Sequence, residues 1–360
     1  MKEKILKSYL IKKILFTFIG VLSVVSIIFL SNGSYIFLRE SLLIGYSNTE
    51  IVYLVFLRLL REAPLIVSFS FIVSVYYSLN KFYKNYEGIV LHAVGIGTKE
   101  IILILKSLLI FIFLLVSISS IFLTPIITYN IDILEESAKS RPTYLNLKEK
   151  QFMTLGNENF IFYSEKVKNS AEQNIQRLEN IFINRDQDGL MQTVIAEKGQ
   201  KKVDSKTYDV YLELDNGKIY NSTHENLSLT NFKRNTILVH ENEHKHLASD
   251  NVIKYYSIFK LIKENTSKNM SEIFYRISQP VLLILLTFFS VLIAKANPRK
   301  SKNLGMIVIV SSFVIYFNSI INVKSQIAIS SLPTSTGFIV LHLFAACLIY
   351  IFYIYKVNRF

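Results

Sequence analysis

Six long apolar stretches stand out in the sequence, three in its first third and three in its last quarter. The first carries no charged side chain from Ile14 to Leu38. At about 1.5 Å per helical residue, this length crosses the ~30 Å hydrocarbon core of a bilayer. The pattern predicts six membrane-spanning helices: Ile14–Leu38, Ala63–Asn80 with a start as early as Ile51, the stretch between Lys106 and Asp132, Ile277–Ala294, Leu304–Val323, and a last helix within Ser325–Tyr355 that begins near Pro333.

The middle of the chain, residues 132–271, is polar and holds no apolar stretch of membrane length. Short apolar segments separated by turn residues predict strands here, and Asp215-Asn216-Gly217 is a strong hairpin signal. The candidate strands are Asn159–Lys166, Leu178–Asn184, Leu190–Glu197, Tyr208–Leu214, Lys218–Tyr220 and Thr236–Val239, and a helix over Lys263–Tyr275 is expected to lead into the fourth span. Successive hairpins predict a sandwich, a jelly roll or an open barrel.

These patterns predict an α+β membrane protein with three spans on each side of one strand-rich domain. The expected parts are residues 1–131 with spans one to three, residues 132–271 with the strands, and residues 272–360 with spans four to six. A short amphipathic helix is expected near residues 83–97, between spans two and three.

The composition supports a membrane protein and limits the ligands and metal sites that the chain can have. Of 360 residues, 51% are hydrophobic, and the formal net charge is +13. Because long apolar stretches separate the charges, anionic lipid headgroups explain this charge better than nucleic acid does. The single cysteine, Cys347, excludes a disulfide within the chain and a cysteine-based metal site. The basic N-terminus precedes a stretch too long for a cleaved signal peptide, which predicts a retained signal anchor.

The distribution of positive charge predicts the topology. Lysine and arginine gather in the N-terminal tail, after span two, after span four and at the C-terminus. These regions share one side if there are six spans, and the positive-inside rule places them in the cytoplasm. Both termini are therefore expected in the cytoplasm and the middle domain outside, in the periplasm of a Gram-negative cell.

His240-Glu241-Asn242-Glu243-His244 matches the H-E-x-x-H pattern of zinc proteases, and Glu264 is a conceivable third ligand. That pattern works on a helix, where both histidines share a face and the glutamate polarises a zinc-bound water. Here it follows Thr236–Val239, a β-branched segment typical of a strand, and it lacks an apolar face. A solvated loop between strands is the simpler interpretation.

Arg58, Arg61 and Glu62 lie at i, i+3 and i+4 near the outer end of span two. Guanidinium groups at headgroup depth bind lipid phosphates well. The simpler interpretation is an ion pair between Arg58 and Glu62 that marks the end of the helix.

The loop after span two, Tyr86–Gly97, combines Glu87 in a first turn with apolar positions 89, 90 and 93 and a closing glycine. This pattern is typical of a short interfacial helix. Such a helix either lies on the membrane surface without a partner or docks into a nucleotide-binding subunit. The chain has no P-loop and no nucleophile elbow, so any energy for work on a substrate comes from a partner.

The order of these features resembles the lipopolysaccharide export permeases, the LptF/LptG family, over nearly the whole chain. Glu87-Gly88-Ile89-Val90-Leu91-His92-Ala93-Val94-Gly95 is similar to the coupling helix of that family, and Asn297-Pro298-Arg299 is similar to its N-P-R loop. Both motifs are more like the F subunit than the G subunit.

The resemblance implies a periplasmic β-jelly-roll and a permease subunit of an ABC transporter, not an enzyme. It implies an LptG-like second permease, a dimer of LptB-like ATPases that binds ATP, and LptC-like and LptA-like bridge proteins. Lipopolysaccharide would pass between gates formed by the first and fifth spans and leave through the jelly roll. Glu87, Leu91, His92 and Gly95 would carry the ATPase contact, and from their position Arg58 and Arg61 are candidates to meet lipid phosphates.

Two other classes of function stay open on the sequence alone. One is a membrane-anchored zinc protease that uses His240, Glu241 and His244, which metal content would reveal. The other is a receptor whose outer domain senses a ligand without transport. The permease interpretation expects no metal or cofactor in this chain.

Overall fold

The computed structural model describes residues 2–44, 46–88, 90, 97–139, 147–154, 160–169, 176–187, 190–204, 209–222, 227–240, 252–295 and 304–357. The chain divides into two compact units. The bundle unit comprises Met1–Gly33, Val55–Ile131 and Asp250–Phe360, and the sheet unit comprises Ser34–Leu54 and Asp132–Ser249.

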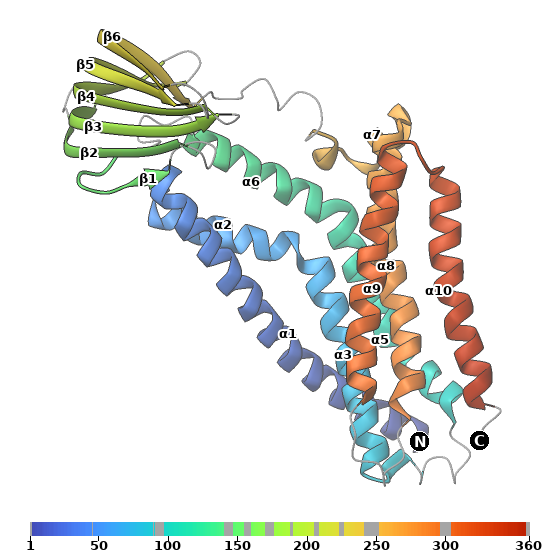
Figure 1. Ribbon diagram of the computed structural model, residues 1–360. Coiled ribbons are helices and arrows are strands. Elements are labelled where there is room, and N and C mark those ends of the chain that lie inside the picture. The colour runs from blue at the N-terminus through green and yellow to red at the C-terminus, as the bar shows by residue number, and fades with distance from the viewer. Residues whose placement is uncertain are drawn as a thin grey trace. The chain divides into compact units, whose positions relative to one another are not determined.

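Among the described residues six helices are long and apolar enough to cross a membrane, which confirms the predicted spans (Figure 1). The first turn of the first helix and the end of the last lie at the same end of the bundle unit, as an even number of spans requires. The spans lie in α1 (Lys2–Ile44), α3 (Ala63–Lys84), α5 (Thr98–Ile118) with its continuation, α8 (Ser267–Ala294), α9 (Leu304–Ala328) and α10 (Thr334–Val357), the last beginning directly after Pro333 as expected.

Prolines set two irregularities in these spans. Pro64 lies in the first turn of α3, where its missing N–H is tolerated, and α2 (Asn48–Arg61) ends just before it. The third span continues from α5 through a π-helical turn, η1 (Ser119–Leu123), into α6 (Thr124–Lys139). Pro125 removes one backbone donor there, and the wider turn accommodates the interruption.

Helices α3 and α8 form the core of the bundle unit. In their most apolar 18-residue windows 67% and 61% of residues are buried, against 11–28% in the other spans. Ser70, Ser74 and Ser78 on α3 and Ser290 on α8 are fully buried or nearly so. Such small side chains let helix backbones approach closely in a membrane. Helices α1, α9 and α10 consequently expose much of their apolar surface.

The strands form one antiparallel sheet in which each strand pairs with the next in sequence (Figure 1). They are β1 (Met153–Thr154), β2 (Phe160–Asn169), β3 (Gln176–Gln187), β4 (Leu190–Val203), β5 (Val210–Ser222) and β6 (Leu227–His240). The α+β class with an inserted strand domain is confirmed. Within the described strands the order is a meander, without the crossovers between non-consecutive strands that a jelly roll has.

A row of interrupted pairing crosses the sheet. Regular cross-strand pairs are missing at Glu165, Asn180, Glu197, Asn216 and Lys233, which lie opposite one another on β2 to β6. Asn180 and Asn216 have φ values of 50° and 53°, a conformation that asparagine tolerates better than most residues. Interruptions of this kind occur where a bulge or bend lets a strand turn a corner in a sheet.

The interruption shifts which alternate residues face inward. On β3, Leu178 is buried before the row, and Ile181 and Ile183 are buried after it. The extra residue thus keeps one face apolar along the whole strand.

The hairpin predicted at Asp215-Asn216-Gly217 is wrong for the same reason, because β5 continues through it. The predicted strands at 159–166, 178–184, 190–197 and 236–239 are confirmed within β2, β3, β4 and β6, although 159 and the turn at 188–189 lie outside the described residues.

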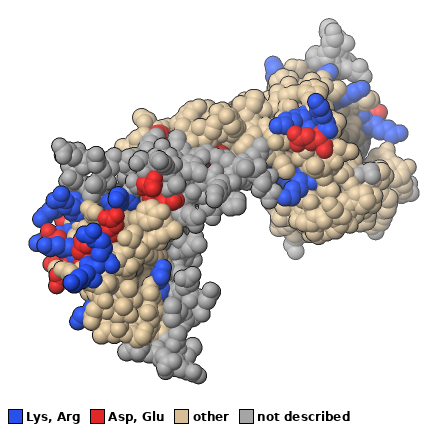
Figure 2. Space-filling view, turned by 90° about the horizontal axis from the view of Figure 1, so that it is seen from above, with Lys and Arg blue, Asp and Glu red and all other residues tan. Residues whose placement is uncertain are grey.

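The two faces of the sheet differ in polarity. Phe162, Ile183, Val194, Leu212 and Leu214 are all at most 1% exposed and form the inner face. Ion pairs cross neighbouring strands on the outer face, where basic and acidic side chains intermix (Figure 2). These pairs are Lys168–Glu179 at 3.1 Å, Lys202–Glu213 at 3.3 Å and Arg234–Asp215 at 3.0 Å.

Two short helical segments precede the fourth span. A 3-10 turn, η3 (Val252–Tyr255), leads to α7 (Ile258–Glu264), which ends at Asn265 in the left-handed conformation. Thr266 then caps α8 by accepting from the backbone N–H of Asn269. The helix predicted over Lys263–Tyr275 is therefore two helices with a break at Asn265.

We expect Gly217→Ala to lower the free energy of unfolding of the sheet by about 1–3 kcal/mol. A Cβ at this position would overlap the carbonyl oxygen of Ile195 and the ring of Phe232. Pulse proteolysis of the full chain in urea, followed on peptides from the sheet, measures the change. Gly20→Ala is the control, because a Cβ there meets nothing within 4 Å and alanine favours a helix. Equal stability of Gly217→Ala and the wild type would contradict the expectation.

A second prediction concerns Lys201, which is 1% exposed on the inner face. Burial lowers the pKa of Lys201 to about 8, below its usual value of 10.5. Between these values the unfolded chain binds one proton more than the folded chain, so the sheet gains stability as pH rises. The same assay should show a gain of about 2 kcal/mol from pH 7.5 to 9.5 in the wild type and none in Lys201→Met. Lys198→Met, an exposed position on the same strand, should retain the gain.

Candidate functional site

Polar and charged side chains form three clusters in the part of the bundle unit that the structure describes. We call them the Glu87 cluster (Tyr9, Lys13, Asn85, Glu87), the Arg276 cluster (Glu272, Arg276, Lys324) and the His342 cluster (Ser278, Tyr316, His342). Because a bilayer offers no water to polar groups, polar clusters within spans are candidate functional positions.

The Glu87 cluster joins the segment after α3 to the first helix. The carboxylate of Glu87 accepts a hydrogen bond from Tyr9 Oη at 2.9 Å and from Lys13 Nζ at 3.3 Å. Asn85 Nδ2 adds a longer bond of 3.5 Å. Partial burial acts to raise the pKa of Glu87, but the Tyr9 hydroxyl and the Lys13 ammonium outweigh it and lower the pKa overall. The carboxylate therefore stays ionised and attached to α1 at neutral pH.

Glu87 lies where a new helical turn begins. Helix α3 ends at Lys84, and Tyr86 has φ of 65°, so the chain changes direction before Glu87. Gly88 packs so tightly on Tyr83 that a Cβ would overlap the ring. The other predicted coupling residues, Leu91, His92 and Gly95, lie outside the described residues, as does the loop Asn297-Pro298-Arg299. Their roles stay predictions.

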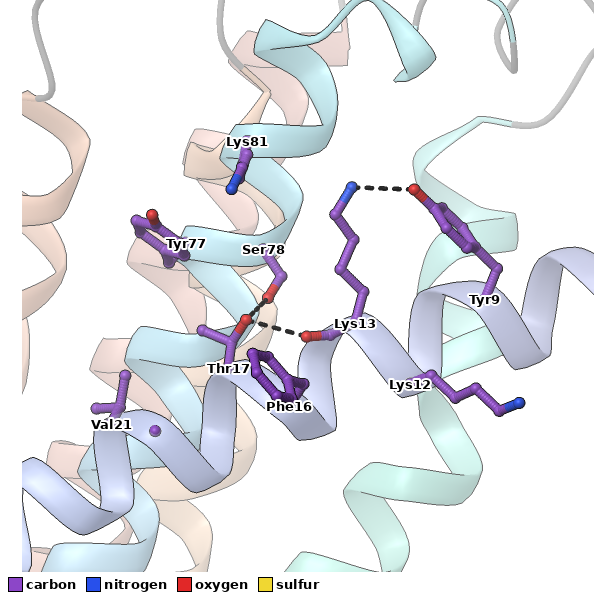
Figure 3. A pocket seen from close by; sticks show the side chains of 10 residues that line it. Tyr9, Lys12, Lys13, Phe16, Thr17, Val21, Tyr77, Ser78 and Lys81 are labelled. Atoms are coloured by element: carbon purple, nitrogen blue, oxygen red, sulfur yellow. Dashed lines mark hydrogen bonds between the residues drawn. The ribbon is translucent and has the colours of Figure 1, made fainter.

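A cavity of about 640 Å³ opens beside the Glu87 cluster, between α1 and α3 (Figure 3). Thr17 Oγ1 accepts a hydrogen bond from Ser78 Oγ at 3.0 Å and itself donates to the carbonyl of Lys13. These bonds fix the wall where the helices meet. The cavity is lined by Tyr9, Lys12, Lys13, Phe16, Thr17, Gly20, Val21, Tyr77, Ser78 and Lys81.

The charged residues at the end of α2 pair differently from the expectation. Glu62 accepts from Arg61 Nε at 3.1 Å, so its described ion pair is with Arg61 rather than Arg58. The carbonyl of Arg61 also accepts from Thr124 Oγ1 at 3.4 Å, which ties the α2–α3 corner to α6. A contact of Arg58 or Arg61 with lipid phosphates stays a prediction.

The Arg276 cluster surrounds a fully buried arginine. Arg276 Nε donates to Glu272 Oε1 at 3.0 Å, and its two terminal nitrogens donate to the carbonyls of Tyr256 and Lys254 at 2.8 and 3.0 Å. A buried guanidinium is stable only when its charge and its donors are met in this way. The cluster therefore fixes the segment before α7 onto α8.

Glu272 also joins α8 to α9. Lys324 Nζ donates to Glu272 Oε2 at 2.7 Å and lies 4.2 Å from the centre of the Tyr275 ring. Arg276 directly precedes the predicted fourth span and Lys324 directly follows the predicted fifth, so in the sequence they are only charges that flank spans. The i, i+4 spacing of Glu272 and Arg276 in the sequence is a signal for an ion pair between them. Nothing in the sequence links Lys324 to either residue.

The His342 cluster lies among α8, α9 and α10. His342 Nε2 and Ser278 Oγ are 2.9 Å apart, and Nδ1 lies 2.5 Å from Tyr316 Oη. Phe274 stacks on the imidazole ring and Phe338 meets it edge-on. Both ring nitrogens thus have partners in an aromatic enclosure. A single histidine in an apolar stretch gave no sequence signal for these partners.

Helix α9 is consequently attached to its neighbours at three heights. The Tyr76 hydroxyl on α3 packs against Gly305 at the start of α9, where a Cβ would overlap it. Tyr316 reaches His342 in the middle, and Lys324 reaches Glu272 near the end. The opposite side of α9 remains apolar and exposed, including Ile307, Ile315 and Ile321.

The H-E-x-x-H segment begins at the end of a strand. His240 is the last residue of β6, and residues 241–244 lie outside the described residues. In zinc proteases a helix places both histidines of this motif on one face. Here the first histidine, His240, lies in a strand, so that helix is not present at this position. Glu264 accepts a hydrogen bond from Asn269 and pairs with Lys260. In the described part of the chain, His, Cys, Asp and Glu form no group of three or more that could hold a metal ion.

Comparison with known proteins assigns the family. The sequence pattern of the lipopolysaccharide export system permeases LptF/LptG matches residues 8–356, which include all six spans and the sheet. No individually curated protein matches the chain. The match does not distinguish the two members of the family. Because it covers nearly the whole sequence and agrees with the fold, this chain belongs to the LptF/LptG family of lipopolysaccharide export permeases.

Proposed function

We propose that this chain is one of two permease subunits of an ABC transporter that extracts lipopolysaccharide from the inner membrane and passes it to a periplasmic bridge. The observation that carries the proposal is the family match over residues 8–356. The structure adds a physical basis, because it separates a fixed helical core from helices with free apolar faces.

The apolar faces of α1 and α9 suit a lipid with several acyl chains. Ile27 and Ile28 on α1 are 64% and 60% exposed, and Ile315 on α9 is 67% exposed. An acyl body needs a wide apolar surface rather than a polar filter. The first and fifth spans of this chain and of a homologous second permease would enclose such a surface and open it laterally.

The Glu87 cluster supports coupling to a partner ATPase. Glu87 begins the segment predicted to dock into that partner, and its carboxylate is attached to α1 through Tyr9 and Lys13. Movement of this segment would therefore act directly on α1, one of the proposed gate helices. In this proposal ATP binds to a dimer of cytoplasmic ATPase subunits, and this chain holds no cofactor.

The sheet unit supports a role in onward transfer. Its inner face is apolar from β2 to β6 except for buried polar side chains such as Lys201, and its outer face carries solvated ion pairs. An acyl chain that left the membrane would find an apolar environment on the inner face. The positive-inside rule places both termini in the cytoplasm and the sheet in the periplasm of a Gram-negative cell, where bridge proteins would receive the lipid.

We expect Glu87→Gln to lower ATP-dependent release of lipopolysaccharide from reconstituted vesicles by about 10- to 100-fold, the value of a charge-assisted hydrogen bond. The measurement uses the complex co-purified with its ATPase and second permease. Tyr9→Phe is the matched variant, because it removes one bond to the carboxylate and leaves the charge. It should lower release less than Glu87→Gln does. Wild-type release by Glu87→Gln would exclude the coupling role.

A second prediction tests the path of the lipid. A photo-crosslinking residue at Ile28 or Ile315 should form adducts with lipopolysaccharide that decrease when ATP is added. The same residue at Leu103 on α5 or Leu348 on α10, which are also exposed and apolar, should react mainly with phospholipid. Mass spectrometry of the adducts distinguishes the two lipids. Equal labelling by lipopolysaccharide at all four positions would argue for a receptor or another function without a gated path.

A further inference from the structure

The cavity between α1 and α3 combines a basic region with an apolar region. Lys13 and Lys81 extend their ammonium groups to the same side of α1, the Lys12 side chain points away from both, and Phe16 and Val21 follow along α1 (Figure 3). Gly20 also lines the cavity. A basic region followed by an apolar region along one helix is complementary to an amphiphile that has an anionic headgroup and an apolar chain. We propose that the cavity binds one anionic glycerophospholipid of the cytoplasmic leaflet, with its phosphate at the lysines and one acyl chain along Phe16–Val21.

The basic region has a surplus of positive charge. Lys12 and Lys81 are exposed, and neither side chain forms an ion pair with another residue that the structure describes. Lys13 already pairs with Glu87, which is the one carboxylate of the neighbouring cluster. The phenol of Tyr77, 47% exposed, adds a hydrogen-bond donor to the wall. Ammonium and hydroxyl donors around a space are suited to a phosphate diester.

The apolar region explains why the ligand is a lipid rather than free phosphate. Phe16 is 83% exposed, and a Cβ built on Gly20 meets no atom within 4 Å. The missing side chain of Gly20 therefore leaves open space in this wall of the cavity, beside Phe16 and Val21. A cavity of about 640 Å³ is of the size that small-molecule ligands occupy, enough for a headgroup and the upper part of one chain.

Such a lipid would act on the coupling segment. Tyr9 and Lys13 line the cavity and also hold Glu87. A phosphate in the cavity competes with Glu87 for Lys13, so occupancy changes how firmly the segment after α3 is attached to α1. The inference rests on the proposed function only for the cytoplasmic orientation of this end of the bundle.

Fluorescence of the full chain in vesicles tests the proposal. The sequence contains no tryptophan, so Phe16→Trp places a single reporter in the cavity. Its quenching by brominated phosphatidylglycerol is compared with quenching by equally brominated phosphatidylcholine. Phe111→Trp, on the exposed apolar side of α5, reports ordinary surrounding lipid in the same way. We expect a several-fold preference for phosphatidylglycerol at position 16 and a ratio near one at position 111.

Variants assign the preference to the cavity. Lys12→Gln with Lys81→Gln should bring the several-fold preference at position 16 close to one, because ammonium groups near the membrane surface attract anionic lipid. Lys7→Gln with Lys99→Gln makes the same change in net charge outside the cavity and should leave the preference intact. Gly20→Leu fills the open space, suits a helix and should also lower it. An unchanged ratio at position 111 in each variant shows that the bundle is still folded.

Three outcomes would overturn the proposal. The first is a ratio at position 16 equal to that at position 111. The second is an equal loss in the control pair, which would assign the preference to surface charge in general. The third is loss of the preference on adding excess inorganic phosphate, which would identify free phosphate as the ligand. None of these measurements requires ATP, lipopolysaccharide or a partner, so they leave the proposed function untouched, and a failure of transport would not change them.

Discussion

The absence of water from the bilayer interior is the constraint on which this bundle depends. A polar group there must find its partner within the protein, because the lipid offers none. Arg276 meets the requirement with one carboxylate and two carbonyls, and His342 meets it with two hydroxyl groups. Each cluster draws on more than one helix, so satisfying the polar groups also fixes how the helices are arranged.

The same constraint divides the spans into two kinds. Helices α3 and α8 are the two most buried spans, and small side chains are buried on both, which favours close approach of helix backbones. Helix α9 is held instead by two directional contacts, at Tyr316 and at Lys324. Separate hydrogen bonds and ion pairs can break and re-form one at a time, whereas a packed interface cannot. This difference suits a bundle in which a core stays fixed while a gate helix moves.

The spans were predictable because each depends on local composition alone. A stretch of about 18 or more uncharged, apolar residues identifies a membrane helix whatever surrounds it, and Pro333 marked the start of the last one. The sheet was predictable only in part. Asn216 and Gly217 are favoured in hairpin turns and also in a bend within a strand, and only the pairing of β5 with both neighbours decides between them. The polar clusters were the least predictable part of the structure. Helix packing brings Lys324 to Glu272 and His342 to Ser278, and no local sequence pattern encodes that packing.

The row of interrupted pairs across the sheet also bears on how such a domain tolerates changes in length. Elsewhere in a strand, one inserted or deleted residue reverses which side chains face inward, and it would turn the apolar face toward solvent. At Glu165, Asn180, Glu197, Asn216 and Lys233 the alternation is already broken. A single-residue change there falls on positions that no regular pair holds in register. Related sheets can therefore be expected to vary in strand length along this row while their apolar faces are preserved on both sides of it.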